Sequence, residues 1–239
     1  MKKILKSLLP KSIIDIYRKI LLKQFRNLRN EEIMLKIYKE KWWGSNKQYD
    51  SEFYSGSGSH DEDIILPYIS AVQDFLKTGR FNVVDVGCGD FNVGSQLYKF
   101  SLNYIACDIV LPLIEHNKNK FVDTNLTFQT LDLVNDALPD GDVLIIRQVL
   151  QHLSNDNILK AISKFSKYQY LILTEQIPST EFISNVDIPS GPGVRHFKKS
   201  GIVLEDPPFN FKFLRKQEIA KVEDMFDKSY IITILYVLN

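Results

Sequence analysis

The stretch VVDVGCGDFNVG, residues 83–94, decides the fold. β-Branched residues lead to an aspartate, Asp85, and a Gly-x-Gly turn with a second aspartate, Asp90, follows at once. This order is typical of a buried strand that turns sharply at its carboxyl end. Glycine at positions 87 and 89 lets the backbone approach a ligand because no Cβ stands in the way. The stretch therefore predicts the first strand of an open α/β sheet with a ligand site at its end.

The rest of the chain alternates between apolar runs and amphipathic segments. We expect strands at 82–86, 104–108, 126–131, 142–147, 170–175 and 230–238. We expect helices at 31–41, 92–100, 111–120 and 155–166, and one that begins with a capping box at Ser59 and Glu62 and ends near Lys77. Strands that alternate with helices predict right-handed crossovers and a mostly parallel sheet. Their continuous apolar runs indicate burial on both faces.

The N-terminal arm, residues 1–29, is strongly basic. It carries nine Lys or Arg residues and one acid, a net charge of +8, and its apolar residues recur at helical spacing. Such a helix can lie on an anionic membrane surface, or it can pack on the domain or on a partner subunit. No apolar run is long enough to cross a bilayer. We therefore expect an N-terminal helical extension and lid segment over 1–60 and the main domain over 61–239.

Two irregular segments are predicted to act as lids. Residues 176–211 are rich in proline and glycine and too long for a simple connection. Residues 42–60 contain the run SGSGS at 55–59. That run is either a flexible linker or a backbone cover over a ligand, with Trp43 and Tyr54 closing over it.

Two classes of ligand compete for the glycine turn. A dinucleotide site requires G-x-G-x-x-G, but the third glycine position holds Asn92. Asp85 and Asp90 would also repel a pyrophosphate. S-adenosylmethionine has no phosphate and carries a sulfonium and an ammonium group, so the two acids favour it.

VVDVGCGD resembles the first motif of class I S-adenosylmethionine-dependent methyltransferases. The resemblance covers about residues 55–239 and is most specific over 81–152. It implies a Rossmann-like α/β fold with a seven-stranded, mostly parallel sheet and helices on both faces. It also implies that Asp108 in YIACDIV binds the ribose hydroxyls and that Asp132 in FQTLDLVND contacts the adenine amino group.

The family's methionine-binding segment is similar to DVLIIRQVLQHLS here. The cofactor-binding residues that we expect are therefore Asp85, Gly87, Cys88, Gly89, Asp90, Asp108, Ile109, Asp132, Leu133, Arg147 and Gln148. Cys88 is expected to line the turn rather than act as a nucleophile.

The acceptor side holds the candidate catalytic residues His152 and Glu175. A histidine has a pKa near the working pH and can take a proton from a hydroxyl, although His152 can equally be structural. We expect Arg195, His196 and Tyr54 to bind substrate, because a cationic loop suits an anionic acceptor; a solvated loop is the alternative. The two cysteines provide neither metal-ligand spacing nor a disulfide framework, so we expect no metal and a cytoplasmic protein, at the inner face of the membrane if the arm binds lipid.

We expect methyl transfer from S-adenosylmethionine to an oxygen, leaving S-adenosylhomocysteine. A looser resemblance, carried by the Gly/Ser run and by PPFN at 207–210, is to a subgroup found with bacterial surface-polysaccharide (capsule) genes. It ranks a sugar hydroxyl or phosphoryl-type group of a glycan precursor first and a small metabolite second. A nucleic-acid substrate is disfavoured because residues 30–239 have a net charge of −7. A non-catalytic, cofactor-binding partner subunit is the remaining alternative, and the oligomeric state stays open.

Overall fold

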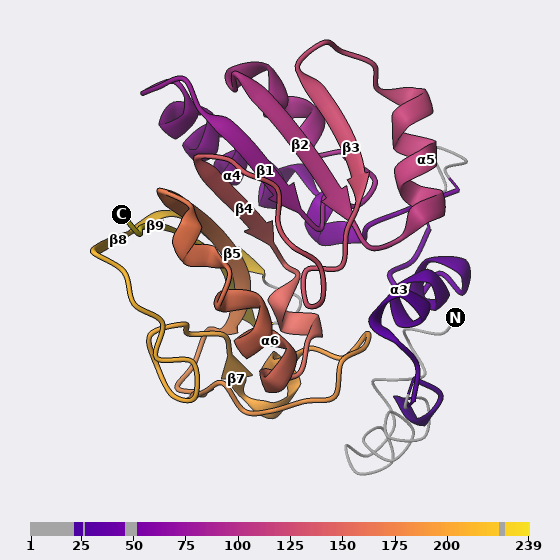
Figure 1. Cartoon of the computed structure of the whole chain (residues 1–239). Helices are drawn as coiled ribbons and strands as arrows, with labels where there is room; N and C mark the ends of the chain where they lie inside the picture. Colours follow the sequence, from indigo (N-terminus) through magenta and orange to yellow (C-terminus); the bar gives the residue numbers. More distant parts are fainter. Residues whose placement is uncertain (1–21, 26, 46–51, 225–227) are drawn as a thin grey trace.

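The protein is described by a computed structural model for residues 22–25, 27–45, 52–224 and 228–239 (Figure 1). Most of the predicted basic arm lies outside these residues, so its contact with a membrane stays a prediction. Within the described part of the chain, no helix is long and apolar enough to cross a membrane.

A seven-stranded sheet forms the centre of the molecule, in the order β3-β2-β1-β4-β5-β9-β8. The parallel part consists of β1 (Asn82–Val86), β2 (Asn103–Asp108), β3 (Leu126–Thr130), β4 (Val143–Arg147) and β5 (Tyr170–Pro178). The antiparallel strands are β9 (Ser229–Val237), which pairs with β5, and β8 (Arg215–Asp224), which pairs with β9. This arrangement confirms the predicted fold class.

Helices cover both faces of the sheet because the central strands are apolar on both sides. Val83 and Ile145 pack on the face covered by α4 (Glu62–Leu76). Val84 and Leu144 pack on the opposite face, against α6 (Asn155–Ile162). In Figure 1, α6 lies in front of the sheet and α4 behind it, with α5 (Leu111–Lys120) beside β3. Alternate side chains of each strand therefore belong to different cores.

Two local predictions are wrong. The expected helix at 92–100 is a pair of 3₁₀ turns, Gly94–Gln96 and Tyr98–Phe100. Helix α4 starts at Glu62 with Asp61 as its N-cap, because the Asp61 side chain accepts the Asp63 N–H (3.1 Å). Ser59, the expected cap, lies in the 3₁₀ turn Ser57–Ser59 instead.

The C-terminal half is more regular than the sequence predicts. Strand β8 was not predicted, since its sequence RKQEIAKVED is mostly charged and its side chains are largely exposed at the sheet edge. Within the expected loop 176–211, β5 extends to Pro178 and two short strands, β6 (Ile183–Ser184) and β7 (Ser200–Gly201), pair with each other. Much of this segment is therefore part of the packed domain.

Helix α3 (Asn30–Lys39) lies on the side of the molecule where β1 to β4 end (Figure 1). Tyr38 of α3 packs with Val110, which directly precedes α5, and with Leu113, which lies within α5. The end of the N-terminal arm joins this helix, since the rings of Phe25 and Trp42 meet edge to face at 5.1 Å. For these described residues, packing on the domain is the arrangement observed.

The buried position of β4 makes a direct prediction about stability. Leu144 is 0% exposed, so Leu144→Ala should lower the free energy of unfolding by roughly 2–5 kcal/mol through lost burial and a residual cavity. Leu214 is 74% exposed, and Leu214→Ala is the matched control, with an expected change within about 0.5 kcal/mol. Urea denaturation measures both, and equal effects would contradict the assignment of β4 to the core.

Candidate active site

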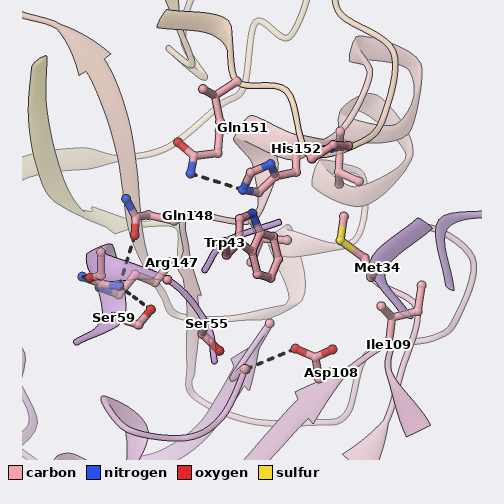
Figure 2. Close-up of a pocket in the computed structure, with 18 of the residues that line it drawn as sticks. Met34, Trp43, Ser55, Ser59, Asp108, Ile109, Arg147, Gln148, Gln151 and His152 are labelled. Carbon is pink, nitrogen blue, oxygen red and sulfur yellow. Dashed lines mark hydrogen bonds between the residues drawn. The ribbon is translucent and has the colours of Figure 1, made fainter. Parts of the chain in front are cut away.

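A cavity of about 450 Å³ lies at the carboxyl ends of the parallel strands. Its walls come from the strand-end turns, from residues of Asn30–Trp43 and of Ser55–Ser59, and from the long segment around Pro192–Phe197. Figure 2 shows side chains from these parts pointing toward one another around the indole of Trp43. The volume is typical of a site for a small molecule.

The glycine turn forms one wall of the cavity. The N–H groups of Gly87 and Cys88 both donate to the Cys107 carbonyl, at 2.8 and 2.9 Å. Gly87 has φ +82°, and a Cβ added there would lie 2.2 Å from Cγ2 of Val149. Only glycine fits this position, because the backbone is left-handed and the neighbouring side chain fills the space.

Asp108 joins the glycine turn to the end of β2. Its carboxylate accepts the N–H of Gly89 (3.1 Å) and the N–H of Val110 (3.0 Å). Burial raises the pKa of Asp108 to about 6. The carboxylate and the neighbouring Ile109 both line the cavity (Figure 2). Each carboxylate oxygen keeps a lone pair for a ligand.

Asp132 lies at the next turn along the sheet, after β3. Its carboxylate accepts the Val134 N–H (2.8 Å) and the Asn135 side-chain amide (2.7 Å). Asp132 and Leu133 line the cavity, together with the apolar side chains of Leu131 and Val134. This part of the cavity offers a polar edge beside an apolar wall.

Arg147 and Gln148 line the cavity at the end of β4. The Arg147 guanidinium donates to the Gly58 carbonyl (2.6 Å) and lies over the Tyr68 ring (4.9 Å). Its Nε is buried and makes no hydrogen bond within the described part of the chain. Gln148 has φ +56°, an uncommon value for a residue other than glycine.

The SGSGS run is an ordered cover of the cavity and not a flexible linker. Residues 55–59 line the cavity, and an added Cβ at Gly58 would lie 2.5 Å from Oε1 of Gln148. Trp43 lines the cavity as expected. Tyr54 does not; its ring stacks on His60 at 4.6 Å and borders a separate small pocket. The expectation that Tyr54 binds substrate is therefore corrected.

Asp85 and Asp90 also lie outside the cavity wall, which corrects the expectation that they contact the cofactor. Asp85 accepts the Tyr104 hydroxyl (2.9 Å) beneath the turn, and burial raises its pKa to about 7. Asp90 accepts the Ser55 N–H (2.9 Å) and contacts Nε2 of His60 (2.6 Å). Neither carboxylate lines the cavity, and their bonds to Tyr104, Ser55 and His60 fix the turn and its cover.

Glu175 is a support for the turn after β4 and not a base facing the acceptor. Its carboxylate accepts the N–H groups of Leu150 (2.9 Å) and Gln151 (3.1 Å). Burial raises its pKa to about 8. The side chain does not line the cavity, because β5 directs it under the 3₁₀ turn Leu150–His152. This corrects the catalytic role predicted for Glu175.

Arg195 is buried and bonded to the protein, which corrects its predicted role in substrate binding. It is 1% exposed, and it donates to the carbonyls of Leu150 (3.3 Å) and Leu153 (2.7 Å) and to the Asn155 side chain (2.8 Å). These acceptors lie about 40 residues earlier in the chain. The neighbouring His196 lines the cavity, and its role in substrate binding stays a prediction.

His152 lines the cavity near the indole of Trp43, with ring centroids 5.4 Å apart. Its Nδ1 lies 3.2 Å from the Gly191 carbonyl, and burial lowers its pKa to about 4. The ring is therefore neutral at ordinary pH. Cys88 also lines the cavity, and burial raises the pKa of its thiol, which fits a packing residue and not a nucleophile.

Several lining residues were not predicted from the sequence: Met34, Trp42, Gln151, Gln176 and Asp224. Gln151 had the clearest signal, since it directly precedes His152 in VLQHLS at the end of a predicted strand. Asp224 belongs to the unpredicted strand β8. Among the described residues, no group of three or more His, Cys, Asp or Glu side chains is placed to hold a metal ion.

Comparison with known proteins shows a fold that this chain shares with methyltransferases. No protein-family model matches the sequence. The ribosomal RNA small subunit methyltransferase A of Mycoplasmopsis synoviae (strain 53) is 23% identical over 111 residues, 45% of this chain and 43% of that protein. The chain therefore matches less than half the length of this curated relative.

Solved structures match over more of the chain. The N-methyltransferase NodS of Bradyrhizobium japonicum WM9, with S-adenosylhomocysteine, has a TM-score of 0.55 at 10% identity, covering 74% of this chain and 88% of that one. Magnesium protoporphyrin IX methyltransferase (ChlM) of Synechocystis PCC 6803 has a TM-score of 0.53 at 16% identity, and the match covers 93% of this chain and 100% of that one. The N-terminal domain of EvdMO1, with S-adenosylhomocysteine and D-fucose, has a TM-score of 0.51 at 11% identity, and the match covers 72% of this chain and 83% of that one. The chain thus has the fold of class I S-adenosylmethionine-dependent methyltransferases.

The surroundings of Arg195 predict a structural effect of its loss. Arg195→Met should lower the free energy of unfolding by about 3 kcal/mol or more, because several buried carbonyls lose their donor. Lys198→Met on the same segment removes one exposed hydrogen bond to the Asp187 carbonyl. This variant should change the free energy of unfolding by less than about 1 kcal/mol. Urea denaturation compares them. Full stability of Arg195→Met with lost activity would instead support a substrate-binding role.

Proposed function

We propose that the protein is an S-adenosylmethionine-dependent methyltransferase that methylates an oxygen of a sugar or glycan precursor in surface-polysaccharide biosynthesis, releasing S-adenosylhomocysteine. The observation that carries the cofactor assignment is the buried carboxylate of Asp108. It lies in the cavity at the end of β2, bonded to the glycine turn at the end of β1. The comparisons support the fold, and the substrate is our inference.

The residues present fit this cofactor. Asp108 has acceptor capacity left for two ribose hydroxyls. The apolar side chains of Leu131 and Val134 suit a flat base, with Asp132 beside them for its amino group. Arg147 has a buried Nε without a partner in the described structure, which suits the carboxylate of the methionine part. The carboxylates of Asp108 and Asp132 among the described lining residues suit a cation without phosphates.

When bound, the cofactor supplies a methyl group on a sulfonium, which is an excellent leaving group. The work left to the protein is alignment and the exclusion of water, and alignment alone contributes on the order of 7–11 kcal/mol. Trp43, the 55–59 run and the segment Pro192–Phe197 enclose the cavity from the side opposite the sheet. They are the elements that keep water from the reacting atoms.

His152 is the remaining candidate for proton transfer from an acceptor hydroxyl. It lines the cavity in the neutral form, with Nδ1 held by Gly191. Its low pKa makes it a weak base, so its contribution falls at the lower end of the ~10²–10⁴-fold that general bases provide. We infer that positioning contributes more than base catalysis here.

The sugar acceptor is supported by the resemblance to the surface-polysaccharide subgroup and by one structural neighbour that was crystallised with D-fucose. A small metabolite is the second candidate, since other neighbours are named for the small molecules that they methylate. A non-catalytic partner subunit would bind the cofactor in the same cavity without turnover.

Cofactor binding should depend on Asp108 and on pH. Asp108→Ala should weaken S-adenosylmethionine binding tenfold or more, about 1.4 kcal/mol upward. In the unaltered protein, affinity should fall roughly tenfold from pH 7.5 to 5, because the Asp108 carboxylate takes up a proton as the pH drops below about 6 and loses acceptor capacity. Titration calorimetry measures both. An unchanged affinity in Asp108→Ala, or the same pH dependence in that variant, would contradict the assignment.

Release of S-adenosylhomocysteine tests the activity itself. We expect release with neutral sugars or nucleotide sugars in a panel that also contains small metabolites. Release with metabolites alone would support the second candidate. Tight cofactor binding without release on any acceptor would favour the non-catalytic subunit.

A further inference from the structure

Gln151 lines the cavity from the 3₁₀ turn Leu150–His152. The backbone of this residue is fixed from two directions. Its N–H donates to Glu175 (3.1 Å), and its carbonyl accepts from the Arg195 guanidinium (3.3 Å). The residue is 6% exposed. Backbone bonds to Glu175 and Arg195 thus hold one uncharged side chain at the cavity wall.

The hydrogen bonds of His152 determine which way the Gln151 amide points. The Gly191 carbonyl can only accept, so Nδ1 of His152 carries the proton and donates to it (3.2 Å). The low pKa of the buried ring leaves Nε2 without a proton. Nε2 therefore accepts from the Gln151 amide nitrogen at 3.5 Å, and Figure 2 shows the Gln151 oxygen on the side away from His152.

That oxygen, Oε1 of Gln151, is buried and has no hydrogen-bond partner among the residues that the structure describes. A buried carbonyl without a donor is costly and uncommon in native proteins. Because the amide nitrogen is committed to His152, the amide cannot turn to present a donor instead. A group that donates a hydrogen bond, from a ligand or from water, satisfies this position.

The charges around the cavity point the same way. The described lining residues include three carboxylates, Asp108, Asp132 and Asp224, and one guanidinium, Arg147. Arg195, the cation that the sequence offered for an anionic acceptor, is used by backbone carbonyls. A phosphate in this cavity would face the carboxylates of Asp108 and Asp132 and the unpaired carbonyl of Gln151.

We propose that Gln151 is a specificity-determining residue for the acceptor, and that its Oε1 accepts a hydrogen bond from a hydroxyl of a neutral sugar. His152 is a positioning residue that fixes the amide, and Trp43 provides the apolar wall beside it. This inference rests on the proposed function and narrows it, because it selects an uncharged hydroxyl acceptor over a phosphoryl-type one.

The test uses matched acceptors and labelled S-adenosylmethionine. Methyl α-glycosides of common hexoses are each paired with the same glycoside carrying a phosphate monoester, and kcat/KM is measured for every pair with the full-length protein. We expect the neutral member of the productive pair to be favoured tenfold or more. Preference for the phosphorylated member would overturn the inference and leave the methyltransferase function standing.

Two variants of Gln151 separate hydrogen bonding from packing. Gln151→Met keeps the length of the side chain and removes the acceptor, so kcat/KM for the neutral glycoside should fall roughly tenfold or more. Gln151→Glu keeps an acceptor oxygen but loses the amide donor to His152, so it should retain clearly more of that activity than Gln151→Met while rejecting the phosphorylated member more strongly. Gln129→Met, exposed on β3 away from the cavity, is the matched control and should change nothing.

Calorimetric affinity for S-adenosylmethionine should be unaltered in all three variants, which shows that they are folded. Full activity of Gln151→Met on the neutral glycoside would overturn the role of Gln151. Equal losses in the Met and Glu variants would show a packing effect and would also overturn it. Cofactor binding with no transfer to either member of any pair would reject the proposed sugar acceptor, and this inference with it.

Discussion

The bond between the Gly89 N–H and the Asp108 carboxylate is the constraint on which the site depends. Together with the donation from Gly87 and Cys88 to the Cys107 carbonyl, it joins the turn after β1 to the end of β2. Parallel strands expose unpaired backbone groups where they end, and these bonds satisfy some of them. The same bonds keep a carboxylate at the cavity wall. One local arrangement thus closes the sheet edge and prepares a polar contact for a ligand.

Buried polar side chains organise the turn after β4 in a different way. Glu175 holds this turn from below through two N–H groups, and Arg195 holds the same turn through its carbonyls. Burying either side chain without partners would be expensive, but each finds several backbone partners. The result is a fixed turn that carries Gln151 and His152. These two uncharged side chains line the cavity, and Glu175 and Arg195 support them.

Regular elements with strong periodicity were predictable from the sequence. Strands β1 to β5 lie within a few residues of their predicted positions, since continuous apolar runs between turns indicate buried strands wherever they occur. Strand β8 escaped prediction because its charged side chains carry no apolar signal, and only pairing with β9 makes it a strand. The helix expected at 92–100 does not form. The apolar residues Phe91 and Leu97 reach the core from short turns instead, so their spacing did not indicate a helix.

The sequence by itself determined the order of strands and turns, the need for glycine at positions 87 and 89, and the location of Asp108 and Asp132 at strand ends. These follow from local rules of backbone geometry and side-chain alternation. Only the tertiary structure decided where polar side chains point. Arg195 and Glu175 look like substrate groups in the sequence, yet each is bonded to a turn 20 to 45 residues earlier in the chain. Burial and hydrogen-bond partners are set by long-range packing, and a short sequence motif does not specify them.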